Sequence, residues 1–202
     1  MSLKLYYSPG ACSLSPHIVL EEAGLAYEAV AASLQNHQLQ DGSDYYKVNP
    51  LGYVPFLVLG NGETLHEGPA IIQYIADQAP DKKLAPANGT MARYHLQEWL
   101  NFIATELHKG FSPLFKPYTP EDFKAKVREA LLSRLAWVDG ELKGKNYLMG
   151  EFTVADAYLF TVTGWAARLN LDISHLANIQ AFRERMLARP AVQAAMKAEG
   201  LI

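Results

Sequence analysis

The sequence predicts an α/β domain followed by an all-helical domain. Strand-like and helix-like patterns alternate up to about residue 80, and Asn61-Gly62 marks a tight hairpin between two of the strands. From Thr90 onward the apolar residues follow helical periodicity, with no convincing strand. A mixed strand and helix pattern that gives way to a purely helical one indicates two domains.

The first part reads as a βαβ unit followed by a ββα unit. We expect a right-handed crossover to make the first two strands parallel, and the Asn61-Gly62 turn to make the last two antiparallel. The result is a mixed four-stranded sheet. The expected strands are 3–7, 26–32, 56–60 and 63–65; the expected helices are 13–24 and 67–79, with a short helix near 43–47.

A polar segment with Pro80, Pro86 and Gly89 separates the two patterns and is typical of an interdomain linker. We therefore predict a first domain over 1–80, a linker over 81–88 and a helical domain over 89–202. Proline and glycine are expected to interrupt the helices there, at Pro113, Pro117, Pro120, Gly140, Gly144 and Pro190.

One helix start in the second part is unusually explicit. Thr153 and Asp156 have the spacing of a capping box, and Phe152 precedes them as a staple residue. This motif predicts architecture rather than catalysis.

The amino-acid composition limits the classes of function that this chain can have. The chain has 202 residues, of which 50% are hydrophobic and 19% charged, and its net charge is -3. These values describe an ordinary folded protein and give no basic patch for nucleic acid. No signal-like or membrane-length apolar segment is seen, and a single cysteine cannot form an internal disulfide, so we expect a cytoplasmic protein with no membrane partner. We expect no metal site.

The single cysteine, Cys12, falls between the first strand and the first helix. The unsatisfied N–H groups and dipole of a helix N-terminus stabilise a thiolate, so this position nominates a reactive thiol. The alternative is a small buried hydrophobe, which is common for free cysteine. With no second cysteine, redox chemistry at Cys12 would need an external small thiol.

Five segments together resemble a cytosolic glutathione transferase, most closely the bacterial beta class, and the resemblance covers the whole chain. It implies a thioredoxin-like N-terminal domain that binds glutathione as co-substrate, a helical domain that completes the pocket for a hydrophobic electrophile, and a homodimer. The segments are Tyr7–Ser15, Asn49–Pro55, Glu67–Ile71, Glu98–Phe111 and Phe152–Ala157.

The resemblance implies glutathione-binding residues in the first domain. Val54 precedes Pro55 in an expected cis peptide, and its backbone would pair with glutathione as an added strand; the alternative is an ordinary trans proline at an edge strand. Glu67 would meet the ammonium group, and the backbone at Gly68 would bind the γ-glutamyl carboxylate. Glu67 could instead only stabilise its helix terminus. His37 stands where relatives carry lysine or glutamine for the glycyl carboxylate, so its charge there depends on pH.

Further candidates lie on the first long helix of the second domain. Asn101, Thr105 and His108 follow i, i+4, i+7 spacing and are expected to share one face. In the beta class the matching residues line the glutathione site, with His108 near the thiol as hydrogen-bond partner or proton acceptor. Glu106 and Lys109 reach either the ligand, the neighbouring subunit or solvent.

The electrophile pocket is expected to draw on aromatic residues of the helical domain. The candidates are Phe111, Phe115 and Trp165, with Tyr158 a weaker one. Aromatic residues at helical spacing more often pack between helices, and that alternative stays open.

The predicted activity is conjugation of the glutathione thiolate to electrophilic, mostly hydrophobic small molecules, as in detoxification. Cys12, Ser13 and His108 are the catalytic candidates, because each could stabilise the thiolate through a hydrogen bond. One alternative is thiol-disulfide exchange or reductive dehalogenation through a mixed disulfide at Cys12. Another is a protein that binds hydrophobic ligands without catalysis.

Overall fold

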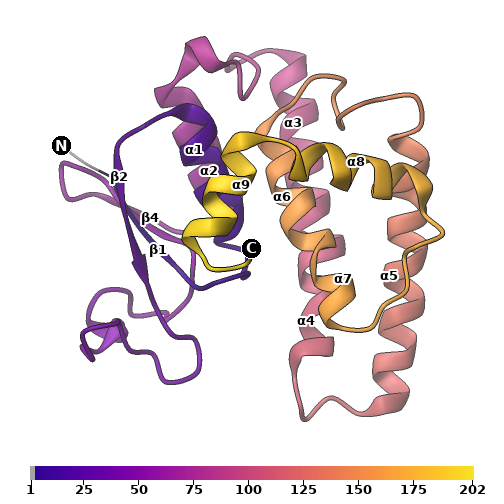
Figure 1. Cartoon of the computed structure of the whole chain (residues 1–202), viewed down its shortest axis with the longest axis horizontal. Helices are drawn as coiled ribbons and strands as arrows, with labels where there is room; N and C mark the ends of the chain where they lie inside the picture. Colours follow the sequence, from indigo (N-terminus) through magenta and orange to yellow (C-terminus); the bar gives the residue numbers. More distant parts are fainter. Residues whose placement is uncertain (1–2) are drawn as a thin grey trace. The chain divides into compact units, whose positions relative to one another are not determined.

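The structure, a computed structural model, describes residues 3–202 and divides the chain into two compact units (Figure 1). One unit comprises the segment that ends at Ala85 together with Arg189–Ile202, and the other comprises Pro86–Ala188. We call them the sheet unit and the helical unit. The last residues of the chain thus belong to the sheet unit, whereas the predicted helical domain ran to residue 202.

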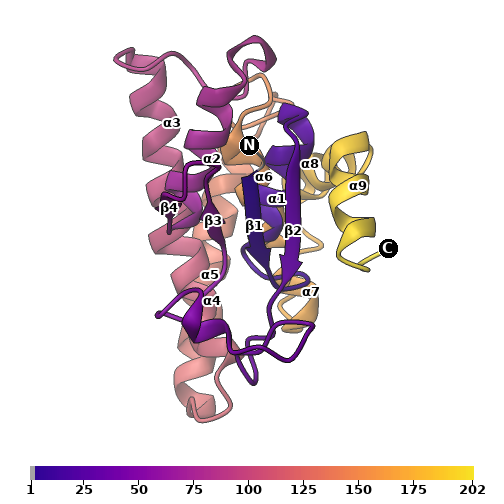
Figure 2. The ribbon, with the colours of Figure 1, turned by 90° about the vertical axis from the view of Figure 1, so that its left-hand side faces the viewer.

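The sheet unit contains a four-stranded mixed sheet in the order β2-β1-β3-β4 (Figure 2). Strand β1 is parallel to β2 and antiparallel to β3, which is in turn antiparallel to β4. Gly62 takes a left-handed φ of 90° in the β3–β4 turn, as a tight hairpin requires. The predicted sheet is confirmed. The strands are β1 Leu3–Tyr7, β2 Tyr27–Ala31, β3 Phe56–Val58 and β4 Thr64–Leu65.

Helices α1 (Leu14–Ala23) and α2 (Gly68–Gln78) pack on one face of this sheet (Figures 1 and 2). Buried aliphatic side chains from both layers, such as Leu57 and Ile72, form the core between them. Gly24 ends α1 in the left-handed conformation with φ 67°. The unit also contains two short 3₁₀ helices, η1 at Tyr45–Lys47 and η2 at Pro80–Lys82.

Helix α9 (Pro190–Ala198) packs against α1 (Figure 1). Arg189 forms a two-point ion pair with Glu22, with N···O distances of 2.6 and 2.9 Å, and Val192 and Ala195 are fully buried. These contacts explain why the end of the chain groups with the sheet unit. Pro190 occupies the first turn of α9, where its missing N–H costs nothing.

The helical unit contains no strand among the described residues. Prolines 117 and 120 lie between α4 and α5 as predicted, but Pro113 lies inside α4 and Gly140 inside α5. Those two predicted breaks were wrong, because the helices continue past these residues to Phe115 and Glu141. The helices are α3 Met91–Phe102, the π-helix η3 Ile103–His108, α4 Lys109–Phe115, α5 Glu121–Glu141, α6 Val154–Thr163, α7 Trp165–Arg168 and α8 Ala177–Leu187.

The predicted capping box at the start of α6 is confirmed. Thr153 and Asp156 exchange the two reciprocal hydrogen bonds, and the backbone N–H of Thr153 donates to Oδ2 of Asp156 at 2.8 Å. Oδ1 of Asp156 also accepts from the backbone N–H of Leu148 at 2.9 Å. Every residue of α6 is buried, so this cap anchors the central helix of its unit.

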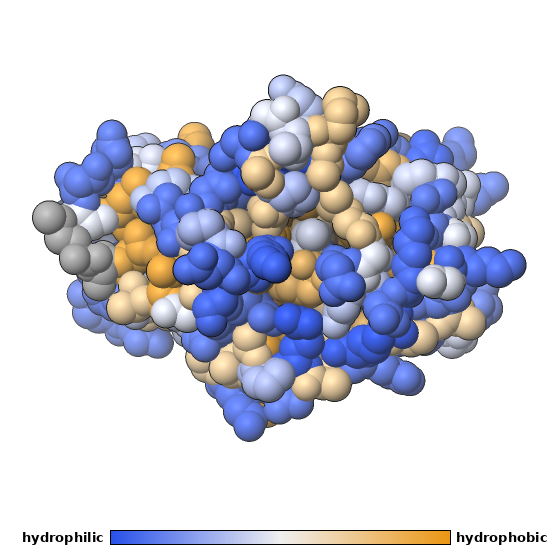
Figure 3. All heavy atoms as spheres, turned by 90° about the horizontal axis from the view of Figure 1, so that it is seen from above, coloured by the Kyte–Doolittle hydropathy of each residue, from blue (hydrophilic) through white to orange (hydrophobic). Residues whose placement is uncertain are grey.

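On the face in Figure 3, hydrophilic residues predominate and hydrophobic ones lie between them. Within residues 3–202, no helix combines the length and the apolar character needed to cross a membrane.

Candidate functional site

The turn between β1 and α1 is closed by Ser13. Its hydroxyl accepts from the backbone N–H of Ser8 at 3.0 Å and donates to the Ser8 carbonyl at 3.2 Å. Ser13 is fully buried. The Ser13 hydroxyl therefore donates its proton within the turn. Its two hydrogen bonds fix the backbone around Cys12 at the beginning of α1.

The Cys12 thiol donates a hydrogen bond to the backbone carbonyl of Val54, with an S···O distance of 3.1 Å. Cys12 is partly buried, and the Val54–Pro55 peptide is cis, as the family resemblance predicted. A carbonyl oxygen binds only the protonated thiol, whereas the N-terminus of α1 favours the thiolate. The fold thus joins two predicted site segments that are 42 residues apart in sequence.

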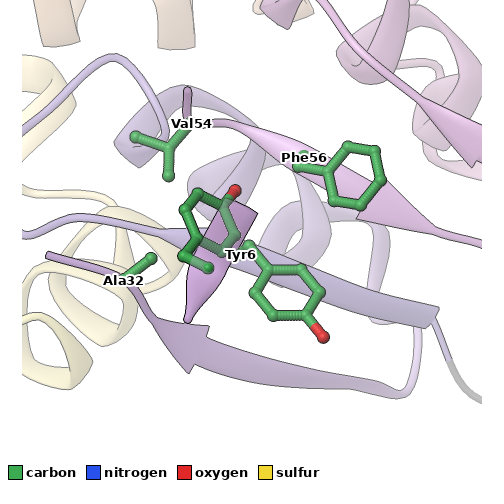
Figure 4. Packing of buried hydrophobic residues seen from close by; sticks show 5 residues of the cluster. Tyr6, Ala32, Val54 and Phe56 are labelled. Atoms are coloured by element: carbon green, nitrogen blue, oxygen red, sulfur yellow. The ribbon is translucent and has the colours of Figure 1, made fainter. Parts of the chain in front are cut away.

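A cluster of buried side chains holds Val54 in place. It comprises Tyr6, Ala32, Tyr45, Val54 and Phe56, most of which Figure 4 shows gathered around Tyr6. The Tyr45 hydroxyl donates to the carbonyl of Tyr53 at 2.8 Å. Burial raises the pKa of Tyr45 to about 12, so this hydroxyl remains a neutral donor. The backbone just before Pro55 is therefore fixed from its buried side.

The N-terminus of α2 lies beside the cis proline. A Cβ built at Gly68 would lie 3.8 Å from Cγ of Pro55, an ordinary contact distance. Glu67 precedes the helix in a left-handed conformation with φ 65°, is exposed and does not cap the helix with its side chain. A non-glycine residue with this φ is strained, and such strain clusters at functional sites.

His37 also has a left-handed φ, 53°, and its ring packs on Tyr46 with centroids 4.4 Å apart. Its Nδ1 is buried and has no hydrogen-bond partner among the described residues. A Cβ at Gly52 would lie 2.8 Å from this nitrogen, so glycine is needed there. The structure places His37 within the loop that leads to Val54.

In the helical unit, the segment Ile103–His108 is a π-helix rather than a continuation of α3. A π-turn is wider than an α-turn and changes the face on which later residues project. Asn101 and Thr105 are exposed, and the Thr105 hydroxyl donates to the Asn101 carbonyl at 3.0 Å. The prediction that Asn101, Thr105 and His108 share one face assumed regular α-helical spacing, and this spacing does not hold across the π-helix before His108.

Glu106 pairs with Arg134 of α5 at 2.8 Å. Both side chains are close to half exposed, so the pair contributes little to stability. Its carboxylate is nevertheless directed to α5, within the helical unit.

His108 is partly buried and contacts two aromatic residues. Its Nδ1 lies 2.7 Å from the hydroxyl of Tyr158, and Trp165 packs edge-on at a centroid distance of 4.9 Å. Burial, and then the charge of Lys109, lower the pKa of His108 to about 4. The imidazole is therefore neutral at pH 7.

Comparison with known proteins places these features in a family. The model of the glutathione S-transferase N-terminal domain matches residues 1–77, and that of the C-terminal domain matches residues 102–190. The chain is 50% identical to glutathione S-transferase GstA of Escherichia coli O157:H7, across 98% of this chain and all of that protein. The chain belongs to the glutathione S-transferase family.

Solved structures agree with this assignment. The ternary complex of BphK, a bacterial glutathione S-transferase, is 56% identical, with a TM-score of 0.95 over 98% of this chain and 99% of that one. The bacterial beta class transferase of Sphingomonas chungbukensis is 48% identical, also with a TM-score of 0.95, over 98% and 100%. The predicted resemblance and the thioredoxin-like and helical architecture are confirmed.

In this transferase the predicted electrophile residues differ in exposure. Phe111, Tyr158 and Trp165 are 0%, 2% and 5% exposed, whereas Phe115 is 42% exposed. Trp165 makes T-shaped contacts with both phenylalanine rings, at 5.9 Å and 5.5 Å. Of the four, Phe115 has the surface to meet a substrate, and the others pack in the core of the helical unit.

Sequence reasoning missed one polar contact that shapes the Cys12 turn. Oε2 of Glu199, just after α9, accepts from the backbone N–H of Gly10 at 2.9 Å, and Oε1 contacts Nδ1 of His17 at 2.8 Å. Both His17 and Glu199 are buried. Burial and the Glu199 charge raise the pKa of Tyr7. No signal in a single sequence could connect Glu199 with a turn 189 residues away.

Proposed function

We propose that this protein is a glutathione transferase that conjugates the thiolate of glutathione to electrophilic, mostly hydrophobic small molecules. The observation that carries the proposal is the contact of Cys12 with the Val54 carbonyl at the cis Pro55 peptide, with the start of α2 beside that proline. A half-identical relative is named a glutathione S-transferase, and a sphingomonad transferase 47% identical to this chain is described in complex with glutathione.

The sheet unit offers complementary groups for a tripeptide with two carboxylates and one ammonium group. The Val54 backbone would pair with the cysteinyl residue as an added strand. The N–H groups at the start of α2, from Gly68 onward, would bind the γ-glutamyl carboxylate, and Glu67 would bind the ammonium group. His37 would meet the glycyl carboxylate.

In the reaction, the thiol of glutathione loses its proton and the sulfur forms a bond to an electrophilic carbon. The leaving group of an aryl chloride departs with the electron pair of the broken bond; in an epoxide the pair stays on the oxygen, and in an isothiocyanate it moves to the nitrogen, where a proton is taken up. Cys12 and His108 are the groups that would interact with the glutathione sulfur. Ser13 would hold the turn that carries Cys12. Asn101 and Thr105 would bind glutathione, and Phe115 would contact the electrophile. Glu106 keeps its ion pair with Arg134.

The test is turnover of glutathione with an activated aryl chloride, an epoxide and an isothiocyanate. We expect conjugation with at least one of them, and Glu67→Ala should raise the KM for glutathione at least tenfold, since a charged hydrogen bond is worth about 1.5–3 kcal/mol. Glu129→Ala, at an exposed position of α5, is the control. Absence of turnover with all three classes, while glutathione still binds, would favour a ligand-binding protein without catalysis.

The second candidate is thiol-disulfide exchange, which the partly buried thiol of Cys12 favours. The Cys12 thiolate would attack the disulfide of oxidised glutathione, forming a mixed disulfide and releasing one glutathione thiolate. A glutathione thiolate would then reduce that mixed disulfide. A single glutathione adduct in the intact mass of the wild type, missing in Cys12→Ala, would support this activity; an unmodified wild type would exclude it.

We further propose a cytoplasmic homodimer that acts in detoxification. The dimer is what the family resemblance implies, and the cytoplasm is proposed because a chain with one cysteine cannot form an internal disulfide. Sedimentation equilibrium should give twice the 22.4 kDa mass of one chain. A single-chain mass at micromolar concentration would contradict the dimer.

A further inference from the structure

In the helical unit, a partly buried histidine meets the hydroxyl of a buried tyrosine on another helix. Nδ1 of His108, at the end of the π-helix, lies 2.7 Å from the hydroxyl of Tyr158 on α6. Tyr158 is 2% exposed. A tyrosine hydroxyl buried to this extent needs a hydrogen-bond partner, and the imidazole nitrogen supplies one.

The chemistry of the two groups indicates which one donates. A phenol is a more acidic donor than the N–H of neutral imidazole, and an unprotonated imidazole nitrogen is a stronger acceptor than a phenol oxygen. The favoured arrangement therefore has the Tyr158 O–H donating to Nδ1. A neutral imidazole whose lone pair lies on Nδ1 carries its hydrogen on Nε2.

The surroundings of His108 keep the ring neutral and hold its orientation. The edge-on contact with Trp165 has an interplanar angle of 69°, so the indole restricts rotation of the imidazole. Among the described residues, the titratable groups that act on the ring are Tyr158 from α6 and the adjacent Lys109, the first residue of α4. Burial and the Lys109 charge both oppose protonation, so an imidazolium does not form near neutral pH.

We propose that Tyr158 is a positioning residue that fixes His108 as the Nε2–H tautomer, so that His108 donates a hydrogen bond to the glutathione sulfur instead of accepting its proton. The S–H bond then breaks with its electron pair left on sulfur, and the proton passes to water. Only the identity of the recipient, the glutathione sulfur, rests on the proposed function.

The first test reads the tautomer directly and needs no substrate. In protein labelled with ¹⁵N-histidine, the chemical shifts distinguish protonated from unprotonated ring nitrogens, and the His108 signals are those that disappear in His108→Gln. We expect Nε2–H in the wild type and a mixture of tautomers in Tyr158→Phe. Thr161→Val, which removes another buried hydroxyl of α6, should leave the His108 signals unchanged. A wild-type ring protonated on Nδ1, or an unchanged tautomer in Tyr158→Phe, would overturn the proposal.

The second test separates a donor from a base. Glutamine can donate from its amide nitrogen but cannot take up a proton, so His108→Gln should retain most of the conjugation rate that His108→Ala loses. If His108→Gln is as impaired as His108→Ala, the donor role is wrong.

Tyr158→Phe should lower kcat about tenfold at pH 6.5, with the apparent pKa of bound glutathione raised by about one and the KM for glutathione little changed. In the His108→Ala background the same substitution should have no further effect, because Tyr158 acts through His108. A wild-type rate in His108→Ala would remove His108 from the reaction and overturn the donor role, whereas the tautomer measurement would stand or fall separately.

Discussion

At the scale of single residues, Gly68 shows how an absent side chain can limit binding. Its φ lies outside the left-handed region, and among the described residues a Cβ there would meet only Pro55, at 3.8 Å, so the site accepts a larger residue. Gly68→Ser should therefore fold normally and add one hydroxyl beside the proposed carboxylate site. We expect glutathione to bind about 3–10 times more tightly, since a net hydrogen bond contributes about 0.5–1.5 kcal/mol.

Titration calorimetry with glutathione measures this affinity directly. Gly68→Ala is the matched control, because it adds the Cβ without the hydroxyl and should leave the affinity close to that of the wild type. Equal affinities for the serine and alanine variants would mean that the γ-glutamyl carboxylate binds elsewhere.

His108 makes a second residue-scale prediction, on stability. Above pH 6.5 it is neutral in both folded and unfolded chains, so it adds no pH dependence there. Below that pH the unfolded chain binds a proton that the folded site excludes until about pH 4, so the free energy of unfolding falls by on the order of 3 kcal/mol. Stability is thus lost as the pH falls, not as it rises.

Urea unfolding at pH 7 and pH 4 measures this term. His108→Gln cannot titrate and should lose correspondingly less stability than the wild type between the two pH values. His95→Gln, at an exposed position of α3, should behave as the wild type. Parallel losses in wild type and His108→Gln would show that the histidine is accessible to protons in the folded state.

At the scale of elements, α9 and the residue that follows it stabilise the turn that carries Cys12. Glu199 satisfies two donors, the Gly10 N–H and the His17 ring, with its two carboxylate oxygens. Glu199→Gln leaves one oxygen for both, so the free energy of unfolding should fall by about 1–3 kcal/mol. Thiol reactivity of Cys12 should also change, because the turn loses a constraint on its backbone.

Chemical denaturation gives the first quantity, and the rate of Cys12 alkylation gives the second. Glu184→Gln, exposed on α8, is the control for loss of a negative charge. Unchanged stability and alkylation in Glu199→Gln would mean that the turn is held by Ser13 alone.

At the scale of the whole molecule, the C-terminal segment Arg189–Ile202 belongs to the sheet unit, although the helical unit precedes it in the sequence. A chain that ends at Ala188 lacks α9 and exposes the side of α1 that α9 covers. We expect that truncation to destabilise the sheet unit by several kcal/mol through lost burial of Val192 and Ala195 and of the Arg189–Glu22 pair. The helical unit should keep its stability.

Hydrogen exchange resolved by segment is the suitable measurement, because it reports β1 and α1 separately from α6. A chain that ends at Gly200 keeps Glu199 and should match the full-length protein. Equal protection of β1 with and without α9 would refute this account of the unit.

The sequence by itself determined those features that depend on neighbours along the chain. The β3–β4 hairpin at Asn61-Gly62, the capping box at Thr153 and the place of Cys12 before α1 each rest on residues a few positions apart, where propensity and turn chemistry act. Motif resemblance added the cis Val54–Pro55 peptide and the family.

Only the tertiary structure decided which distant groups meet. The pairing of His108 with Tyr158, the carboxylate of Glu199 at Gly10, the ion pair of Glu106 with Arg134 and the return of α9 to α1 join segments tens of residues apart or more. Such contacts are fixed by packing of whole helices, and the π-turn at Ile103–His108 alters the periodicity on which sequence patterns rely. Local rules therefore cannot predict them, because the free energy that selects them comes from burial in the assembled core.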